Sequence, residues 1–304
     1  MELEKLELER QEIKKKMDKF NAIGAILIGI GLIITVVINI VGILFVFVGI
    51  FLIGNAFSTK TRFSSIYKGK IVNAIIKEEL GESAVYMPKE MISIQEINEC
   101  RLLQKPDRYR GEDYIKATYD DVVFEMCDLI LEEEVVTTDS NGNVTRSYEQ
   151  YFKGRFFIFD FNKDMNKTLY VMPGMGRPRG VKLTKFETES IEFNKKFNTY
   201  ADSNEDGFYL LTPKMIESML ELQKLYKGRQ YYCFLNGKFY VAINNHSDSL
   251  EVNVNKPIDE KSLKYTRSDL KIAPAIINEF GLNKSKFTIE KMEEVKKDDD
   301  EINI

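Results

Sequence analysis

The densest group of chemically capable side chains in the sequence is the stretch DRYRGED, which supplies three carboxylates and two arginines. The carboxylates of Asp107, Glu112 and Asp113 could bind a divalent cation or share a proton in general acid–base catalysis. The guanidinium groups of Arg108 and Arg110 could clamp a phosphate. One hypothesis is therefore a hydrolase or metal enzyme that uses these acids.

A structural interpretation of the same stretch is simpler. The two arginines can neutralise the acids, and Gly111 suits a turn before the strand DYIKATY. Side chains alternate along a strand, so Glu112 and Asp113 would point to opposite faces of the sheet. We therefore predict a salt-bridged corner of the fold, with the catalytic residues unknown and with Asp160 as a further carboxylate for the enzyme hypothesis.

A second candidate is the loop PGMGRPRG, in which Arg177 and Arg179 could contact an anion or a lipid headgroup. Its three glycines do not have the spacing of a dinucleotide-binding loop. Pro178 and the strand that follows also exclude the helix N-terminus that a phosphate loop needs. The alternative is a flexible connection between two strands.

Metal-ligand and cofactor patterns are weak in this chain. The one histidine, His246, cannot build a multi-histidine metal site. The cysteines are three, far apart and not arranged as a CxxC pair, which favours buried thiols in a reducing compartment: Cys100, Cys127 and Cys233. We expect neither a cofactor nor a resident metal ion.

The elements that must position these residues begin with an anchor. No charged residue occurs from Phe20 to Thr59, and the apolar run covers residues 22–54. One helix of that length would overshoot a hydrocarbon core of about 30 Å. We predict a transmembrane hairpin of two short helices that turns near Ile38 and Asn39, with one long helix as the alternative. The glycines of this run either pack the helices closely or are merely tolerated in lipid.

The charged flanks of the apolar run predict its orientation. Lysines and arginines lie on both sides of it, which places both flanks on the cytoplasmic side. We therefore predict a multi-pass protein of the inner (plasma) membrane with both termini in the cytoplasm. The net charge of −4 gives no case for nucleic acid as a partner.

The first twenty residues are typical of an amphipathic helix. Leu3, Leu6, Ile13 and Met17 follow a heptad seam that Arg10 interrupts. The seam could contact a partner or a second copy of the chain. Alternatively, the helix is a stalk that lies on the membrane surface.

After residue 106 the hydrophobic period changes to two, and two Asn-Gly pairs mark hairpins. This pattern predicts an α+β fold with a mainly antiparallel sheet and flanking helices. We predict five segments, which are an amphipathic N-terminal helix (1–20), the transmembrane hairpin (21–57), membrane-proximal helices (58–105), the cytoplasmic α+β domain (106–288) and a charged disordered tail (289–304).

The order of several motifs in the body resembles an uncharacterised bacterial family known as domain of unknown function 3137. The motifs are DRYRGEDYIKA, FKGRFFIFDFNK, FNKKFNTYA, YLLTPKM, GKFYVAI and DLKIAPAIINEFGLN. The resemblance covers roughly residues 66–283 and implies a membrane-anchored protein with a cytoplasmic domain and no established activity. It also implies a LemA-type membrane protein as a partner. The chain departs from the family where a longer segment is shortened to MGRPRG.

We therefore expect a membrane-anchored cytoplasmic interaction or scaffold module, in contact with the lipid bilayer and with a membrane-protein partner or a second copy. Two alternatives stay open. The first is binding of anionic lipid headgroups through the basic loop, and the second is the carboxylate-dependent hydrolase.

Overall fold

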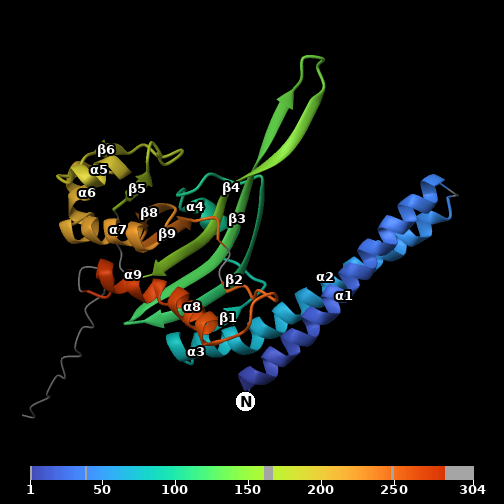
Figure 1. Cartoon of the computed structure of the whole chain (residues 1–304). Coiled ribbons are helices and arrows are strands. Elements are labelled where there is room, and N and C mark those ends of the chain that lie inside the picture. The colour runs from blue at the N-terminus through green and yellow to red at the C-terminus, as the bar shows by residue number, and fades with distance from the viewer. Residues whose placement is uncertain (1, 38–39, 161–166, 248–249, 285–304) are drawn as a thin grey trace, which may run out of the picture.

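The computed structural model of the chain describes residues 2–37, 40–160, 167–247 and 250–284. Two long helices lie side by side and extend away from the rest of the molecule (Figure 1). They are α1 (Glu2–Val37) and α2 (Gly42–Tyr67). Both are long and apolar enough to cross a membrane. The predicted two-helix hairpin is thus confirmed, although the turn residues Ile38 and Asn39 lie outside the described residues.

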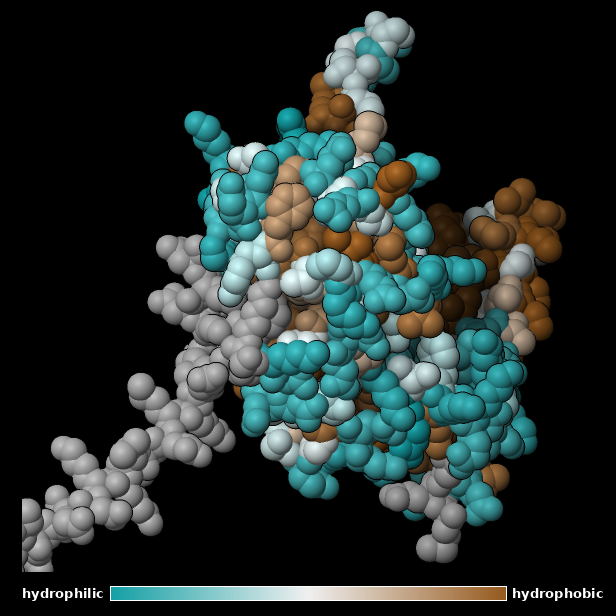
Figure 2. All heavy atoms as spheres, turned by 90° about the vertical axis from the view of Figure 1, so that its left-hand side faces the viewer, coloured by the Kyte–Doolittle hydropathy of each residue, from teal (hydrophilic) through white to brown (hydrophobic). Residues whose placement is uncertain are grey.

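The apolar surface of the hairpin differs sharply from the surface of the body. Many large hydrophobic side chains of α1 and α2 are exposed, such as Val36, Leu44 and Phe51. Figure 2 shows hydrophobic side chains gathered on this hairpin at the right of the view, while the body facing the viewer is mainly hydrophilic. Soluble proteins rarely expose so much contiguous apolar surface, which supports association with a membrane.

Glycines let the two helices approach each other closely. A Cβ added at Gly42 would lie 2.3 Å from the carbonyl oxygen of Gly31, and one at Gly49 would lie 2.6 Å from that of Gly24. No atom lies within 4 Å of a Cβ added at two other glycines of the hairpin, Gly29 and Gly54. Gly42 and Gly49 therefore allow close packing of the two helices, whereas no contact requires glycine at Gly29 or Gly54.

The helix α1 begins about twenty residues before its apolar run. Its first turns pack against the body, where Leu6 is buried in the core. Arg10 is also buried, donates to the carbonyl oxygen of Val254 at 2.6 Å and pairs with Glu7. The Glu7 carboxylate accepts from the backbone N–H of Ile258 at 2.8 Å. The interruption of the heptad seam is thus an intramolecular contact with the loop 250–258.

Nine strands form one sheet in the described part of the chain, and every pairing is antiparallel. The predicted α+β class is confirmed. In sheet order the strands are β1 (Val85–Met87), β2 (Arg108–Tyr119), β3 (Val122–Thr138), β4 (Val144–Asp160), β9 (Lys238–Asn244), β8 (Arg229–Leu235), β5 (Leu169–Pro173), β7 (Phe197–Ala201) and β6 (Thr184–Phe186).

Helices flank this sheet and α2 continues into the body. A π-helical segment, η1 (Lys68–Val72), joins α2 to α3 (Asn73–Leu80). The other helices are α4 (Ile94–Glu99), α5 (Ile191–Lys196), α6 (Asn204–Leu210), α7 (Pro213–Leu225), α8 (Glu260–Leu270) and α9 (Ile272–Phe280). The long β3–β4 ribbon projects from the body beyond the neighbouring strands (Figure 1).

Hydrophobic side chains fill both faces of the sheet, as the strand alternation predicts. The larger core includes Phe157, Phe239 and Ile276 and reaches the C-terminal end of α2 through Phe63. The smaller core lies around α4 and contains all three cysteines. Each of these thiols is buried and free, as predicted. The predicted tail of residues 289–304 lies outside the described residues.

Candidate functional site

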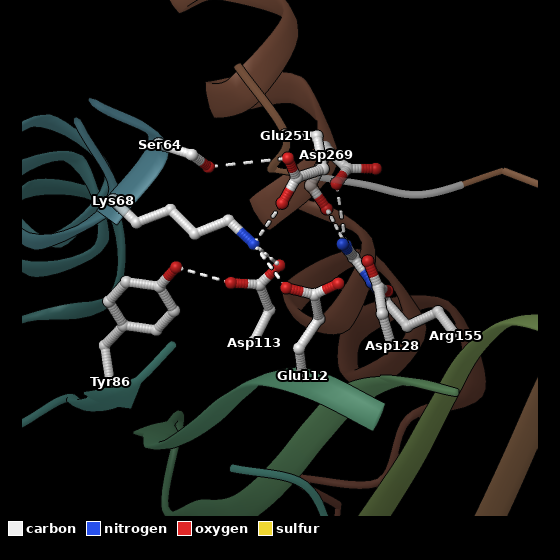
Figure 3. Close-up of polar contacts among 9 residues, drawn as sticks. All are labelled: Ser64, Lys68, Tyr86, Glu112, Asp113, Asp128, Arg155, Glu251 and Asp269. Carbon is white, nitrogen blue, oxygen red and sulfur yellow. Dashed lines mark hydrogen bonds and ion pairs between the residues drawn. The ribbon is translucent and has the colours of Figure 1, made fainter. Parts of the chain in front are cut away.

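A buried lysine marks the point where the hairpin meets the body. Lys68 begins the π-helical segment that follows α2, and its side chain is only 5% exposed. Its Nζ lies 2.8 Å from Glu112 Oε2 and 2.8 Å from Asp113 Oδ2, and it also pairs with Glu251 (Figure 3). Short π-helical segments inside α-helices often occur at functional positions.

A β-bulge brings two of the three carboxylates onto this lysine. In the β2–β3 pairing, Glu112 is opposite Asp128, but the next paired residue of β2 is Ile115, opposite Met126. Asp113 takes a left-handed backbone conformation, with φ of 59°. The prediction that Glu112 and Asp113 point to opposite faces is therefore wrong, because the bulge breaks the alternation.

Two hydroxyl groups complete the cluster. Tyr86 in β1 donates from its Oη to Asp113 Oδ1 at 2.5 Å. Ser64 in α2 donates from its Oγ to Glu251 Oε2 at 3.5 Å. The cluster thus joins the end of α2 to β1, to the β2 bulge and to the loop after β9. We call Ser64, Lys68, Tyr86, Glu112, Asp113 and Glu251 the Lys68 cluster.

Burial and charge act in opposite directions within the Lys68 cluster. Burial acts to lower the pKa of Lys68, but the charge of Asp113 and hydrogen bonds to the three carboxylates hold it above its ordinary value. Burial raises the pKa of Asp113 to about 7, although the ammonium of Lys68 and the hydroxyl of Tyr86 oppose the rise. Burial also raises the pKa of the Tyr86 hydroxyl, which therefore remains a hydrogen-bond donor.

A second buried ion-pair network lies beside the first (Figure 3). The Nε of Arg155 in β4 donates to Asp128 Oδ1 at 2.9 Å. Its Nη1 lies 2.8 Å from Asp269 Oδ2 in α8. Burial acts to lower the pKa of Arg155, but the two carboxylates raise it overall and keep the guanidinium charged. This network ties α8 to the middle of the sheet.

The geometry of Glu112, Asp113 and Glu251 could accommodate a metal ion, because one oxygen from each lies within 4.8 Å of the others. The ammonium of Lys68 contacts all three carboxylates. It therefore provides the positive charge that a cation would supply. The arrangement fits a structural ion-pair cluster in which the buried charges are mutually satisfied.

The remaining predicted residues of DRYRGED have separate roles. Asp107 accepts from the backbone N–H of Glu134 at 2.8 Å, away from the Lys68 cluster. The guanidinium of Arg108 lies over the ring of Tyr148, 3.3 Å from its centroid. Arg110 lines a small cavity near the bulge. The expectation that these arginines pair with Glu112 and Asp113 is wrong, because Lys68 pairs with both.

Gly111 and Asp160 also differ from their expected roles. Gly111 lies inside β2 rather than in a turn, and a Cβ there would be 2.7 Å from the carbonyl oxygen of Asp128. Its function is close packing against β3. Asp160 ends β4 opposite Val123, at a different part of the sheet from the bulge.

The basic loop lies on a cleft that sequence reasoning did not anticipate. Arg177 and Arg179 line a cavity of about 810 Å³, together with Arg101 and Arg229 from distant segments. The Nη1 of Arg101 donates to the carbonyl oxygen of Gly180 at 2.5 Å and so attaches the loop to the segment after α4.

One sequence signal could have found the centre of the Lys68 cluster. Lys68 shares a helical face with Val72, Ile75 and Ile76, all of which are buried. A lysine on an apolar stripe needs a buried anionic partner. The partners themselves come from segments 44 and 183 residues further along the chain, at Glu112 and Glu251, and helical spacing cannot indicate them.

Asp113 predicts a pH dependence of stability. Its folded-state pKa of about 7 lies above the unfolded value of 3.8, so its contribution to stability is full below pH 3.8 and is lost as the pH rises through 7. We expect unfolding of the full chain in micelles to become easier by about 2–3 kcal/mol between pH 5 and pH 8 through this group.

Asp113→Asn should remove this component, because asparagine does not titrate and tolerates the left-handed backbone. Glu112→Gln serves as the control, since its side chain is 43% exposed, and it should retain the pH dependence. Thermal unfolding by circular dichroism across that pH range measures both. Equal pH slopes in the native chain and in Asp113→Asn would contradict the assignment.

The fold and this cluster define a class of protein, in which buried ion pairs fix an α+β body to a pair of long apolar helices. Residues 150–282 match the model of the family described as "Protein of unknown function (DUF3137)". The match confirms, for that region, the resemblance found in the sequence. Lys68, Glu112 and Asp113 precede the matched region, whereas Arg155, Arg177 and Arg179 lie within it.

Two further comparisons add little about function. No curated protein matches the chain significantly. Among solved structures, the crystal structure of the mycobacterial trehalose monomycolate transport factor A, TtfA, is similar with a TM-score of 0.37 and 7% sequence identity. That similarity covers 68% of this chain and 95% of the other. A likeness at this level carries no argument about what this chain does.

Proposed function

We propose that the protein is a membrane-anchored interaction module, in which a two-span hairpin holds the α+β body at the cytoplasmic face of the plasma membrane. The observation that supports this proposal most is the Lys68 cluster. It fixes the end of α2 to β1, to the β2 bulge and to the loop after β9 by buried charges. A hairpin joined in this way fixes the orientation of the body, as a scaffold requires.

The alternative of a carboxylate-dependent hydrolase receives less support. Its candidate acids are Asp107, Glu112 and Asp113. Asp107 accepts a hydrogen bond from the backbone N–H of Glu134, and Glu112 and Asp113 pair with Lys68. A general acid or base needs a position from which it can reach a substrate proton. Asp113, with a side chain only 1% exposed, does not have such a position.

The partner in this proposal is a membrane protein, for which a LemA-type protein or a second copy of the chain are the candidates. Affinity purification of the full chain with its anchor intact, in mild detergent, tests the proposal. Stoichiometric recovery of one membrane protein, or a dimer by light scattering, is the expected result. Isolation of a monomer that carries a tightly bound nucleotide or metal ion would favour the enzyme hypothesis instead.

The topology gives a separate prediction. The three native cysteines are buried, so cysteines introduced by substitution can be labelled selectively. With both termini in the cytoplasm, Ser140→Cys at the tip of the β3–β4 ribbon should resist a membrane-impermeant maleimide added to sealed cells. Val41→Cys at the hairpin turn, where the native side chain is 52% exposed, should react.

Both variants should react after the membrane is permeabilised, which controls for access. Reaction of Ser140→Cys from outside the sealed cells would reverse the predicted orientation. Equal protection of Val41→Cys and Ser140→Cys in sealed cells, followed by equal labelling after lysis, would place the hairpin turn on the cytoplasmic side as well.

A further inference from the structure

An arginine-lined cleft lies on the body, apart from the Lys68 cluster. Its volume is about 810 Å³, which falls within the usual range for ligand pockets. Four arginines contribute to its lining, and no aspartate or glutamate does among the described residues: Arg101, Arg177, Arg179 and Arg229. Asp107 and Glu133 act on Tyr151 from outside the lining, but the four arginines outnumber them and produce a local potential that attracts anions.

The charges of these arginines remain available to a ligand. In the described part of the chain, none of the four takes part in an ion pair with a protein carboxylate. Arg101 is the one with a hydrogen bond to the loop itself, at the carbonyl oxygen of Gly180, and that bond leaves its charge uncompensated. Arg146, outside the cleft, by contrast pairs with Glu134.

The loop that carries two of the arginines is held in place by hydrogen bonds. Asn198 in β7 donates from its Nδ2 to the carbonyl oxygen of Gly174 at 2.7 Å. The Oη of Tyr200 donates to the carbonyl oxygen of Gly176 at 3.3 Å. Pro178, within the loop, is buried. A loop restrained in this way loses less conformational entropy when a ligand binds.

The remaining lining of the cleft is aromatic and apolar. Tyr151 and Tyr231 lie beside Met172 and Leu183 on its walls. The hydroxyl of Tyr151 donates to the carbonyl oxygen of Gln104. Burial raises the pKa of the Tyr231 hydroxyl, although Arg229 opposes the rise, so this hydroxyl stays protonated. A site with several guanidinium groups and an apolar wall suits an anion that also carries an apolar part.

We propose that this cleft binds a phosphate-bearing anion through the guanidinium groups of Arg177, Arg179, Arg101 and Arg229. Guanidinium groups bind phosphate oxygens in a bidentate manner, which lysine cannot reproduce. The phosphate could belong to an anionic lipid headgroup, which the membrane anchor would bring close, or to a soluble phosphate compound. The inference does not depend on the proposed interaction with a membrane protein.

The test uses the full chain in uncharged detergent micelles and follows its thermal unfolding midpoint. One series adds inorganic phosphate, another adds phosphatidylglycerol, and a third adds phosphatidylcholine as the uncharged comparison. Ligands that bind only the folded state stabilise it in proportion to the logarithm of one plus the ratio of free ligand concentration to Kd, so the midpoint begins to rise near Kd and continues to rise above it. We expect a rise of this form with phosphate, with phosphatidylglycerol or with both, and a weaker effect at high salt.

Arg177→Ala/Arg179→Ala should weaken the apparent affinity at least about tenfold. Arg146→Ala/Lys264→Ala removes the same charge from exposed positions outside the cleft and should leave the affinity unchanged. Arg177→Lys/Arg179→Lys retains the charge without the planar fork and should have an intermediate effect. Since Arg177 and Arg179 are exposed loop residues, these variants should fold.

The series with inorganic phosphate and the series with phosphatidylglycerol together identify the source of the phosphate. A rise with phosphatidylglycerol alone supports a lipid headgroup, and a rise with inorganic phosphate supports a soluble compound. Equal loss in the cleft double variant and in the charge-matched control would overturn the proposal, because attraction by net charge would then explain the binding. The absence of a midpoint rise with either anion in the native chain would overturn it as well.

Discussion

Replacing Lys68 with methionine is expected to lower the free energy of unfolding by about 3–5 kcal/mol. Methionine has a similar length, so the change leaves little cavity and mainly removes the ammonium. The carboxylate of Asp113, whose side chain is 1% exposed, would then be buried beside Glu112 and Glu251 without a cation. An uncompensated buried charge is among the most destabilising changes known in proteins.

The design includes an internal rescue and a matched control. Asp113→Asn in the Lys68→Met background removes the stranded charge and should recover a large part of the loss, as a double-mutant cycle measures. Lys70→Met changes an exposed lysine of the same π-helical segment and should cost less than about 0.5 kcal/mol. Chemical unfolding of the full chain in micelles gives the free energy of unfolding for Lys68→Met, Asp113→Asn, their double variant and Lys70→Met.

Two results would contradict the structural role of Lys68. One is a similar small cost for Lys68→Met and for Lys70→Met. The other is an additive double variant, in which Asp113→Asn gives no rescue. Additivity would mean that the two side chains do not interact in the folded chain.

Much of the fold could be predicted from local sequence signals. The uncharged run, the basic flanks and the strand period indicate an apolar hairpin followed by an antiparallel body. Asn-Gly pairs at the β3–β4 and β8–β9 turns indicate hairpins that the structure contains. Thr212 caps α7 and Pro213 begins it, as the sequence suggests. These features are encoded within a few residues, so no tertiary information is needed.

The Lys68 cluster is harder to predict from local sequence signals, because it depends on the β-bulge in β2. Perfect alternation after Gly111 would separate Glu112 from Asp113, and one bulge brings both onto Lys68. No short pattern in DRYRGED signals that bulge. By sequence alone Lys68 is one of the basic residues that follow the apolar run, whereas its burial makes it a structural ion-pair partner.

The arginine-lined cleft was also only partly predictable from the sequence. The sequence indicates Arg177 and Arg179 as a pair within one loop. Arg101 and Arg229 come to the same cavity from the segment after α4 and from the start of β8. These residues are far apart in the sequence, so the sequence indicates only two of the four arginines. The other two can be assigned to the cleft only when the three-dimensional structure is known.

The hairpin and the Lys68 cluster together make the position of the body depend on how α1 packs against α2. Lys68 directly follows α2, and α1 touches the body independently through Arg10. Any change in the spacing of the two helices must therefore be accommodated at one of these attachments. This dependence makes the glycine contacts of the hairpin the second place where a small substitution should have a large effect.

Gly42→Ala is expected to destabilise the helix pair by roughly 1–3 kcal/mol, the usual range for overpacking a tight contact. The added methyl group would lie 2.3 Å from the carbonyl oxygen of Gly31 and 2.4 Å from Thr35 Oγ1. The nearest obstacle is backbone, which cannot rotate away as a side chain can. The helices must separate, with loss of the close packing that holds membrane helices together.

Gly54→Ala is the matched control, because it makes the same chemical change in the same helix where no atom lies within 4 Å of the new Cβ. It should be neutral or slightly stabilising, since alanine favours helix more than glycine does. Loss of helicity during titration with a denaturing detergent measures both variants. Equal midpoints for Gly42→Ala and Gly54→Ala would mean that close backbone contact contributes nothing to the hairpin, and tolerance in lipid would then explain all of its glycines.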